Sequence, residues 1–229
     1  MTEELSIAAV QQAGRCRFLD LELLVGPGVL VPRAETELLA LTAIELLQDG
    51  ADRPLLLVDL CCGAGNLACA IAAHLPSARV WACDLLPAAV ELTRLNVDQL
   101  GLAGRVTVLQ GDLLAPLAGL GLEGLLDAMV CNPPYISTSR LAGDRGALLE
   151  HEPREAFDGG PYGFSIHQRV TREAGPFLKA GAPLLMELGL GQDRQVAMLV
   201  KRSGAWEEPA FRPDGAAPAR VIVCRRKRS

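Results

Sequence analysis

Aromatic residues are scarce in this chain of 229 residues, at 4% of the total. A surface that stacks single-stranded nucleic acid needs several exposed rings, so the sequence disfavours that role. Positive charge is also limited: the formal net charge is −5, and four of the 22 lysines and arginines lie in the last nine residues. The body of the chain is therefore acidic, and we expect no nucleic-acid partner.

Paired metal ligands are missing as well. The chain has seven cysteines, an odd number, without CxxC spacing, and its three histidines form no HxxxH pair. We therefore predict no zinc or other metal site. Cys61 and Cys62 are adjacent and cannot easily bridge each other, so the cysteine pattern indicates a reduced, cytoplasmic protein.

Targeting and membrane signals are lacking too. The first 15 residues begin with acids and do not follow the basic-then-apolar plan of a signal peptide. Residues 60–78 contain no Asp, Glu, Lys or Arg, as a membrane span would. Gly63, Gly65 and Pro76 interrupt this run, which indicates a loop followed by a helix. We expect no membrane partner.

What is present is a core-forming composition, with 50% hydrophobic and 21% charged residues. The length favours one large domain. Short apolar runs alternate with longer amphipathic ones, which predicts an α/β fold with a parallel sheet and crossover helices. The expected strands are residues 55–60, 80–84, 106–110, 126–131, 183–188, 207–212 and 220–225, and the expected helices are residues 36–47, 66–74, 87–100, 163–178 and 192–202.

Two stretches do not follow this alternation. Residues 16–25 and 29–31 flank Gly26-Pro27-Gly28, which predicts a β-hairpin before the sheet begins. Residues 115–124 are rich in glycine and leucine, and their pattern assigns them to no element.

Polar and glycine residues follow the first three expected strands. Ligands of open α/β sheets bind outside the carboxyl ends of the strands. The first strand leads into Asp59-Leu60-Cys61-Cys62-Gly63-Ala64-Gly65, where glycines allow close backbone approach and a helix start offers free amides. An ordinary strand-to-helix turn would also use glycine.

Acids follow the next two strands. Asp84 comes 25 residues after Asp59, where a carboxylate can accept both hydroxyls of a ribose, and Gly111-Asp112 follows the third strand. Three acids at neighbouring strand ends suit a nucleoside that carries a cationic group better than a diphosphate. No GxxxxGK[ST] phosphate loop occurs.

The fourth strand is followed by Asn132-Pro133-Pro134-Tyr135. Proline lacks an N–H and fixes φ, so this segment forms a stiff edge with unpaired carbonyls. Asn132 adds a side-chain acceptor, and Tyr135 adds a ring face. The segment suits a planar NH2 group, although two prolines can also simply end a strand.

These stretches together resemble class I S-adenosylmethionine (SAM)-dependent methyltransferases, and within them the protein-(glutamine-N5) methyltransferases that modify peptide release factors. Asn-Pro-Pro-Tyr is typical of N-methylation in general. The narrower resemblance depends on Val-Pro-Arg-Ala-Glu-Thr-Glu-Leu-Leu over residues 31–39 and on residues 151–160, which run from His-Glu-Pro-Arg to Asp-Gly-Gly.

The resemblance implies a Rossmann-like sheet of seven strands with helices on both faces, preceded by a β-hairpin. It implies an N-terminal segment with the hairpin over residues 1–35 and a catalytic domain over residues 36–229. The cofactor would be SAM and the product S-adenosylhomocysteine. The implied cofactor-binding residues are Asp59, Cys61, Cys62, Gly63, Ala64, Gly65, Asp84, Leu85, Asp112, Leu113 and Asn132, and the implied catalytic residues are Asn132, Pro133, Pro134 and Tyr135.

The chain departs from the family pattern at two places. Cys61 stands where the family usually has glycine. Only about 15 residues precede the expected hairpin, whereas family members usually carry an N-terminal helical domain that grips the release factor. We therefore expect either a partner chain that replaces this domain or a smaller substrate.

Three functions follow as alternatives: N-methylation of a glutamine side-chain amide in a protein such as a release factor, N-methylation of a small molecule, and a non-catalytic SAM-binding subunit. The intact Asn132–Tyr135 motif speaks against the third. The sequence leaves open the roles of Arg33 and Glu187, which can line a pocket or form ion pairs. It also leaves open His151, which can be a base or a surface residue.

Overall fold

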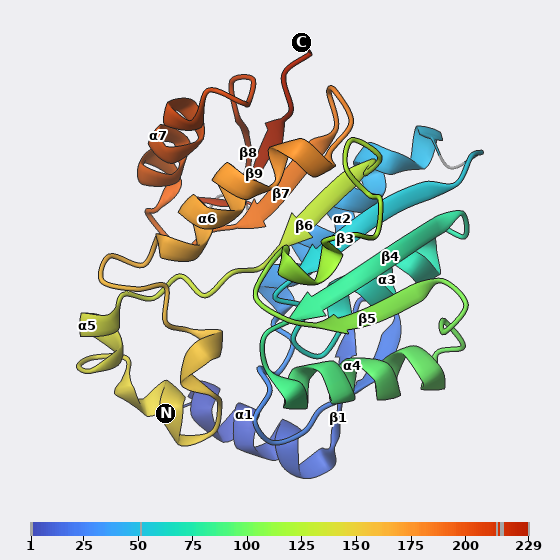
Figure 1. Cartoon of the computed structure of the whole chain (residues 1–229). Helices are drawn as coiled ribbons and strands as arrows, with labels where there is room; N and C mark the ends of the chain where they lie inside the picture. Colours follow the sequence, from blue (N-terminus) through green and yellow to red (C-terminus); the bar gives the residue numbers. More distant parts are fainter. Residues whose placement is uncertain (1, 51, 214, 216–217, 229) are drawn as a thin grey trace.

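A single seven-stranded sheet organises the computed structural model, which describes residues 2–50, 52–213, 215 and 218–228 (Figure 1). The strand order is β5-β4-β3-β6-β7-β9-β8. The five strands from β5 to β7 are parallel, and β9 and β8 add two antiparallel pairings at one edge. The strands are β3 (Leu55–Leu60), β4 (Ala78–Asp84), β5 (Val106–Gln110), β6 (Ala128–Cys131), β7 (Pro183–Glu187), β8 (Ala210–Pro213) and β9 (Ala219–Arg225). The predicted seven-stranded α/β sheet is confirmed.

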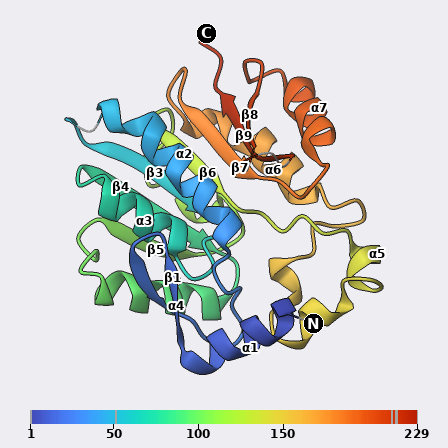
Figure 2. The same ribbon diagram turned by 180° about the vertical axis from the view of Figure 1, so that it is seen from behind.

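Helices cover both faces of this sheet (Figures 1 and 2). Successive strand residues alternate between two hydrophobic cores: Leu57 and Val130 belong to one, and Val58 and Met129 to the other. The first core packs against α2 (Glu37–Leu47), α3 (Asn66–His74) and α4 (Pro87–Gln99). The second packs against α6 (Ser165–Glu173) and α7 (Asp193–Ser203). Because both faces are buried, the strands read as continuous apolar runs.

The hairpin exists, but its predicted position is wrong. Strand β1 (Arg15–Phe18) pairs with β2 (Leu21–Leu24) across a two-residue turn at Leu19 and Asp20. Leu19 has a left-handed φ of 52°, and its N–H donates to Glu37 Oε1 at 2.8 Å. This turn lacks the glycine or asparagine that usually marks a tight hairpin, so its position could not be predicted from the sequence.

Residues 29–31, predicted as the second hairpin strand, belong to no strand. Val29 and Val31 are instead buried side chains of a loop, and the Val31 N–H donates to Glu152 Oε1 at 2.8 Å. Their alternation reflects burial of Val29 against α4 and of Val31 against α1 and the hairpin, rather than pairing in a ladder.

Other elements differ from the expectations in extent. Helix α1 (Thr2–Ala13) precedes the hairpin and was not predicted; the Gln11 side chain donates to the His151 carbonyl at 3.0 Å. The helix predicted over residues 163–178 ends at Glu173, and a 3-10 turn (Gly175–Phe177) containing Pro176 follows it. Proline cannot continue the helical hydrogen bonds. The unassigned residues 115–124 contain a short 3-10 helix (Ala115–Leu117) followed by turns. Within the described ranges, no helix combines the length and the apolarity that crossing a bilayer requires.

Candidate active site

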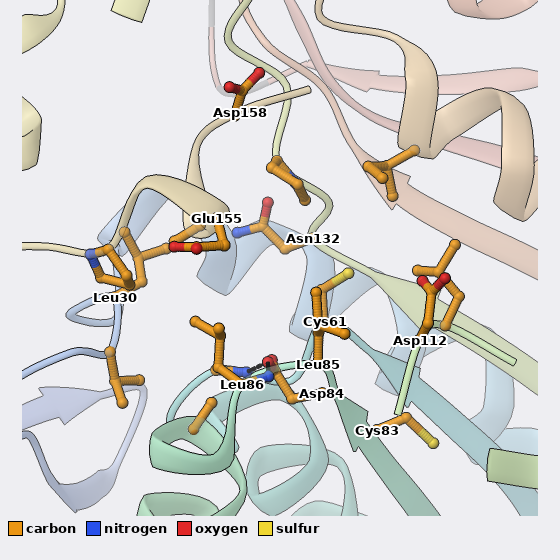
Figure 3. Close-up of a pocket in the computed structure, with 18 of the residues that line it drawn as sticks. Leu30, Cys61, Cys83, Asp84, Leu85, Leu86, Asp112, Asn132, Glu155 and Asp158 are labelled. Atoms are coloured by element: carbon orange, nitrogen blue, oxygen red, sulfur yellow. Dashed lines mark hydrogen bonds between the residues drawn. The ribbon is translucent and has the colours of Figure 1, made fainter. Parts of the chain in front are cut away.

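A cavity of about 290 Å³ opens at the carboxyl ends of the parallel strands. Strand ends contribute Asp84, Gly111 and Asn132 to one wall, and residues 153–158 contribute to the opposite wall. A smaller cavity of about 30 Å³ adjoins it and shares Leu30, Cys61, Gly63 and Asn132 with it. Figure 3 shows Asn132 between the turn that carries Cys61 and the segment that carries Glu155. The cavity therefore lies where ligands of open α/β sheets bind.

The turn after β3 has an unusual backbone. Cys61, Gly63 and Gly65 all have left-handed φ values, of 57°, 55° and 79°. Glycine adopts this conformation freely and cysteine does not, which explains why a related turn would use glycine at the position of Cys61. A Cβ added at Gly63 would meet no protein atom within 4 Å, so a side chain there would project into open space. A Cβ at Gly65 would lie 2.7 Å from Thr93 Cγ2. Gly63 thus keeps the cavity open, and Gly65 allows α3 and α4 to approach.

Asp84 lines the larger cavity with a fixed carboxylate (Figure 3). The Gly63 N–H donates to Oδ2 and the Leu86 N–H donates to Oδ1, each at 2.9 Å. Burial raises the pKa of Asp84, and the backbone donors oppose that shift only in part. The carboxylate keeps lone pairs available toward the cavity, which Leu85 also lines.

Asp59 does not reach either cavity. It is fully buried within β3, and its Oδ2 accepts a hydrogen bond from the Ala68 N–H at 3.0 Å. Its Oδ1 is buried without a partner among the described residues. Burial raises the pKa of Asp59 to about 8, and nearby Asp84 adds to the shift. Among the other residues of this turn that were predicted to bind the cofactor, Gly65 lines neither cavity, whereas Cys62 and Ala64 line the smaller one.

Asp112 and Leu113 line the larger cavity at the end of β5. Both Asp112 oxygens accept hydrogen bonds from the Arg169 guanidinium, at 3.0 and 2.9 Å. Leu113 has a left-handed φ of 50°. Sequence reasoning missed Arg169, which lies 57 residues away on α6. The pairing leaves Asp112 less available to a ligand than Asp84.

Asn132 lies where the two cavities meet. Its Nδ2 donates to Thr36 Oγ1 at 3.1 Å. Its Oδ1 accepts no hydrogen bond from any residue that the structure describes. Pro134 lines the larger cavity, whereas Pro133 is buried and lines neither. The Asn132 oxygen is therefore a free acceptor at the centre of the site.

Tyr135 does not line the cavities, although the sequence placed its ring beside the acceptor. Its hydroxyl donates to Glu187 Oε1 at 3.3 Å, and burial, with the nearby Glu187 charge, raises its pKa to about 12. The Gln192 side chain donates to the Tyr135 carbonyl at 2.9 Å. The ring is therefore packed between the motif and the loop after β7.

A buried polar network behind Asn132 was not predicted. Glu187 is 2% exposed, and its Oε2 accepts the Thr36 hydroxyl at 2.7 Å. Arg220 of β9 reaches Glu187 Oε1 at 3.5 Å. His167 of α6 has a ring nitrogen 2.9 Å from the Glu187 carbonyl, and burial lowers the pKa of this histidine to about 4. Only the strand-end position of Glu187 marked it in the sequence.

Arg33 forms an ion pair with Glu152. The sequence left the role of Arg33 open and assigned none to Glu152. The Glu152 side chain is fully buried and also accepts the Val31 N–H. His151 is exposed and contributes its carbonyl to α1. The pair connects the loop before α2 to the segment that lines the larger cavity. Arg33 also lines the smaller cavity, so it fills both of the roles that the sequence left open.

The cavity-lining cysteine Cys83 is not an activated thiol. All seven cysteines are free, and Cys61 and Cys83 line the larger cavity. Burial raises the pKa of Cys83 to about 12, with nearby acids adding to the shift. A thiolate nucleophile needs a lowered pKa, so this environment does not activate Cys83.

Known proteins are similar to this chain in sequence and in architecture. A family model described as Methyltransferase small domain matches residues 40–150. The release factor glutamine methyltransferase of Moorella thermoacetica is 39% identical over 214 residues, which are 93% of this chain and 73% of that protein. A 4-amino-L-phenylalanine/4-methylamino-L-phenylalanine methyltransferase of Streptomyces pristinaespiralis is 35% identical over 87% of this chain and 67% of that protein.

A solved structure is also similar to this chain. The protein-(glutamine-N5) methyltransferase (release factor-specific) of Alicyclobacillus acidocaldarius matches with a TM-score of 0.50 and 25% identity, over 89% of this chain and 99% of that chain. The sheet, the cavity at its carboxyl edge and the family model define a class I methyltransferase, a class that uses SAM. The chain belongs to the release factor glutamine methyltransferase family, as the Moorella relative shows.

The chemistry of the residues that line the two cavities fits SAM. The open space beside Gly63 admits a ligand close to the backbone, and the Asp84 carboxylate faces the cavity as an acceptor. The acids near the cavity match a ligand with a positive charge and vicinal hydroxyls. The smaller cavity extends from the larger one toward Asn66 at the start of α3. These observations are consistent with a nucleoside in one part of the site and a polar tail in the other.

Proposed function

We propose that this chain transfers a methyl group from SAM to the side-chain amide nitrogen of a glutamine in a peptide release factor. The observation that carries the proposal is Asn132, whose oxygen is an unpaired acceptor at the junction of the two cavities. An acceptor there matches the N–H donors of a primary amide. Family membership narrows the amide to that of glutamine in a release factor.

We propose that the strand-end residues hold the cofactor. Asp84 would accept the ribose hydroxyls, the Cys61–Gly65 backbone would surround the methionine portion, and Asp112 and Leu113 would lie beside the adenine. When bound, SAM supplies an electrophilic methyl group on a sulfonium. Asp59 would act indirectly, because its bond to the Ala68 N–H fixes the first turn of α3 behind the glycine turn.

The Asn132 oxygen would bind one N–H of the amide that is methylated. The Pro133 carbonyl, which the sequence predicts as the second acceptor, stays a prediction, because Pro133 lines neither cavity. An amide nitrogen is a poor nucleophile because its lone pair is delocalised into the carbonyl. Two acceptors that hold its N–H groups favour positive charge on nitrogen as it pyramidalises, and they fix its orientation. If the group to be methylated were an oxygen without N–H donors, its lone pairs would face the lone pairs of these hydrogen-bond acceptors. That mismatch would cost about 1–3 kcal/mol for each buried unsatisfied group.

A second candidate is N-methylation of a small aromatic amine. The Streptomyces relative, whose name gives an amino-substituted phenylalanine as its substrate, is about as similar to this chain as the release factor enzymes are. An arylamine NH2 is also planar and carries two donors. The proposed protein substrate therefore needs a direct comparison with this class. A partner chain that assists recognition and a cytoplasmic location stay predictions.

The test offers the purified chain SAM with an isotopically labelled methyl group and three acceptors. These are an intact release factor, a peptide with its glutamine-bearing loop, and 4-amino-L-phenylalanine. Tandem mass spectrometry should locate the label on a glutamine amide nitrogen of the release factor. Asn132→Ala should lower kcat by about 100-fold while SAM still binds. Label on the arylamine alone would favour the second candidate, and label on oxygen, carbon or sulfur would contradict the acceptor argument.

A further inference from the structure

We infer that Thr36 and Glu187 are positioning residues, which together fix the amide of Asn132 with its oxygen toward the methyl acceptor. The inference rests on the proposed function for the role of Asn132, whereas the orientation of its amide depends only on the side chains of Thr36, Asn132 and Glu187. None of them is adjacent in sequence: Thr36 precedes α2, Asn132 follows β6, and Glu187 ends β7.

The three side chains form one continuous chain of hydrogen bonds. Asn132 Nδ2 lies 3.1 Å from Thr36 Oγ1, and Thr36 Oγ1 lies 2.7 Å from Glu187 Oε2. Thr36 and Glu187 are each 2% exposed, so water has little access to compete for these bonds. The chain begins at a buried carboxylate and ends at the cavity.

The number of protons decides which way the Asn132 amide faces. An ionised carboxylate only accepts hydrogen bonds, and a threonine hydroxyl has a single proton. The Thr36 hydroxyl donates its proton in the hydrogen bond to Glu187, so Thr36 can offer only a lone pair to Asn132. The NH2 end of the amide must then face Thr36, and the oxygen must face the cavity. A flipped amide would set two acceptors against each other, which carries the cost of an unmade buried hydrogen bond.

The same carboxylate also holds the other end of the motif. Glu187 Oε1 accepts from the Tyr135 hydroxyl at 3.3 Å and faces Arg220 at 3.5 Å. Glu187 therefore links Asn132 and Tyr135, the first and last residues of Asn-Pro-Pro-Tyr, through its two oxygens. A residue that only filled space would not need this arrangement of donors.

The relay should respond to pH through Glu187. Burial raises the pKa of Glu187, and the Thr36 hydrogen bond and the Arg220 charge oppose that shift. The other groups that face it are Tyr135, His167 and Glu35, of which Glu35 adds to the increase. A protonated Glu187 can donate to Thr36, which frees the Thr36 proton for Asn132 and allows the amide to flip. The active orientation is therefore lost as the pH falls through the Glu187 pKa.

The kinetic test compares Thr36→Val, Thr36→Ser and Glu187→Gln on whichever acceptor the wild-type chain methylates. Thr36→Val should lower kcat about tenfold with unchanged SAM affinity by calorimetry, and Thr36→Ser should restore most of the loss. Glu187→Gln should remove the loss of kcat toward acid pH. Thr42→Val is the matched control, because Thr42 is also buried but donates only to the Leu38 carbonyl within α2.

A second readout does not depend on the acceptor. In the labelled apoprotein, the Asn132 carboxamide protons, assigned by their loss in Asn132→Ala, should exchange at least tenfold faster in Thr36→Val. Thr36→Ser and Thr42→Val should leave their exchange unchanged. Equal exchange and kcat in Thr36→Val and wild type, with a folded variant, would overturn the relay. Failure to methylate glutamine would overturn the proposed function alone, because the exchange measurement still decides the relay.

Discussion

At the residue scale, Asp84 and Asp112, two of the acids that line the larger cavity, differ in how much of each carboxylate is already engaged. Asp84 receives two backbone N–H groups, which orient it without neutralising its charge. Asp112 receives both donors of the Arg169 fork. A paired carboxylate has fewer lone pairs for a ligand, so similar acids at neighbouring strand ends have different capacities.

This difference predicts unequal effects on SAM affinity. Asp84→Ala should weaken binding by more than tenfold, because a buried acceptor for two hydroxyls is lost. Asp112→Ala, the matched control at the next strand end, should weaken binding only a few-fold, since Arg169 already engages its oxygens. Isothermal titration calorimetry with SAM measures both. Equal losses in the two variants would contradict the assignment of the ribose to Asp84.

At the element scale, the segment of residues 153–158 forms one wall of the cavity through two attachments. The Ile136 N–H donates to the Phe157 carbonyl, and the Gly159 N–H donates to the Ile136 carbonyl, each at 2.8 Å. The second attachment is Glu152, which binds the Val31 N–H and Arg33 from the loop before α2. The wall therefore depends on contacts between segments about 120 residues apart.

Removal of the second attachment should loosen this wall. Glu152→Ala leaves the buried Val31 N–H without its acceptor, which should cost about 1–3 kcal/mol of unfolding free energy. SAM should dissociate several-fold faster, measured by stopped-flow fluorescence or by ligand chase. Glu150→Ala, an exposed acid of the same segment, is the control and should change neither quantity. A dissociation rate like that of wild type in Glu152→Ala would show that the wall does not gate the site.

At the scale of the whole molecule, the sheet was predictable from sequence because its central strands β3, β6 and β7 are buried on both faces. Runs such as Leu55–Leu60 and Pro183–Glu187 are apolar without alternation, and the strand ends marked Asp84 and Asn132 as cavity residues. The hairpin turn at Leu19 has no sequence signal, so its position was not predictable. The sequence did not predict the roles of Arg169, Thr36 and Arg220. These roles arise from contacts between segments far apart in the chain, which no local sequence pattern marks.

The stability of the whole molecule should depend on pH through Asp59. Its pKa is about 8 in the folded chain against an ordinary value of 3.8, and burial is the main cause. The folded state therefore retains a proton that the unfolded state releases. The contribution of protonated Asp59 to the free energy of unfolding is fully present below the pKa of the unfolded chain, 3.8, and is lost as pH rises toward 8. The slope from this one group is at most about 1.4 kcal/mol per pH unit.

Asp59→Asn removes this titration while keeping an oxygen for the Ala68 N–H. The new amide NH2 would lie where Oδ1 has no partner among the described residues, which adds a cost that does not vary with pH. Unfolding free energies from urea titrations of the apoprotein should therefore diverge with pH. Relative to wild type, the variant should gain stability steadily between about pH 4 and 8 and show a constant difference outside that range. Titrating groups that do not interact with Asp59 cancel in the difference, and Asp84 is the neighbouring acid that does interact with it. Parallel curves for the two proteins would mean that Asp59 is ionised in the folded chain at neutral pH.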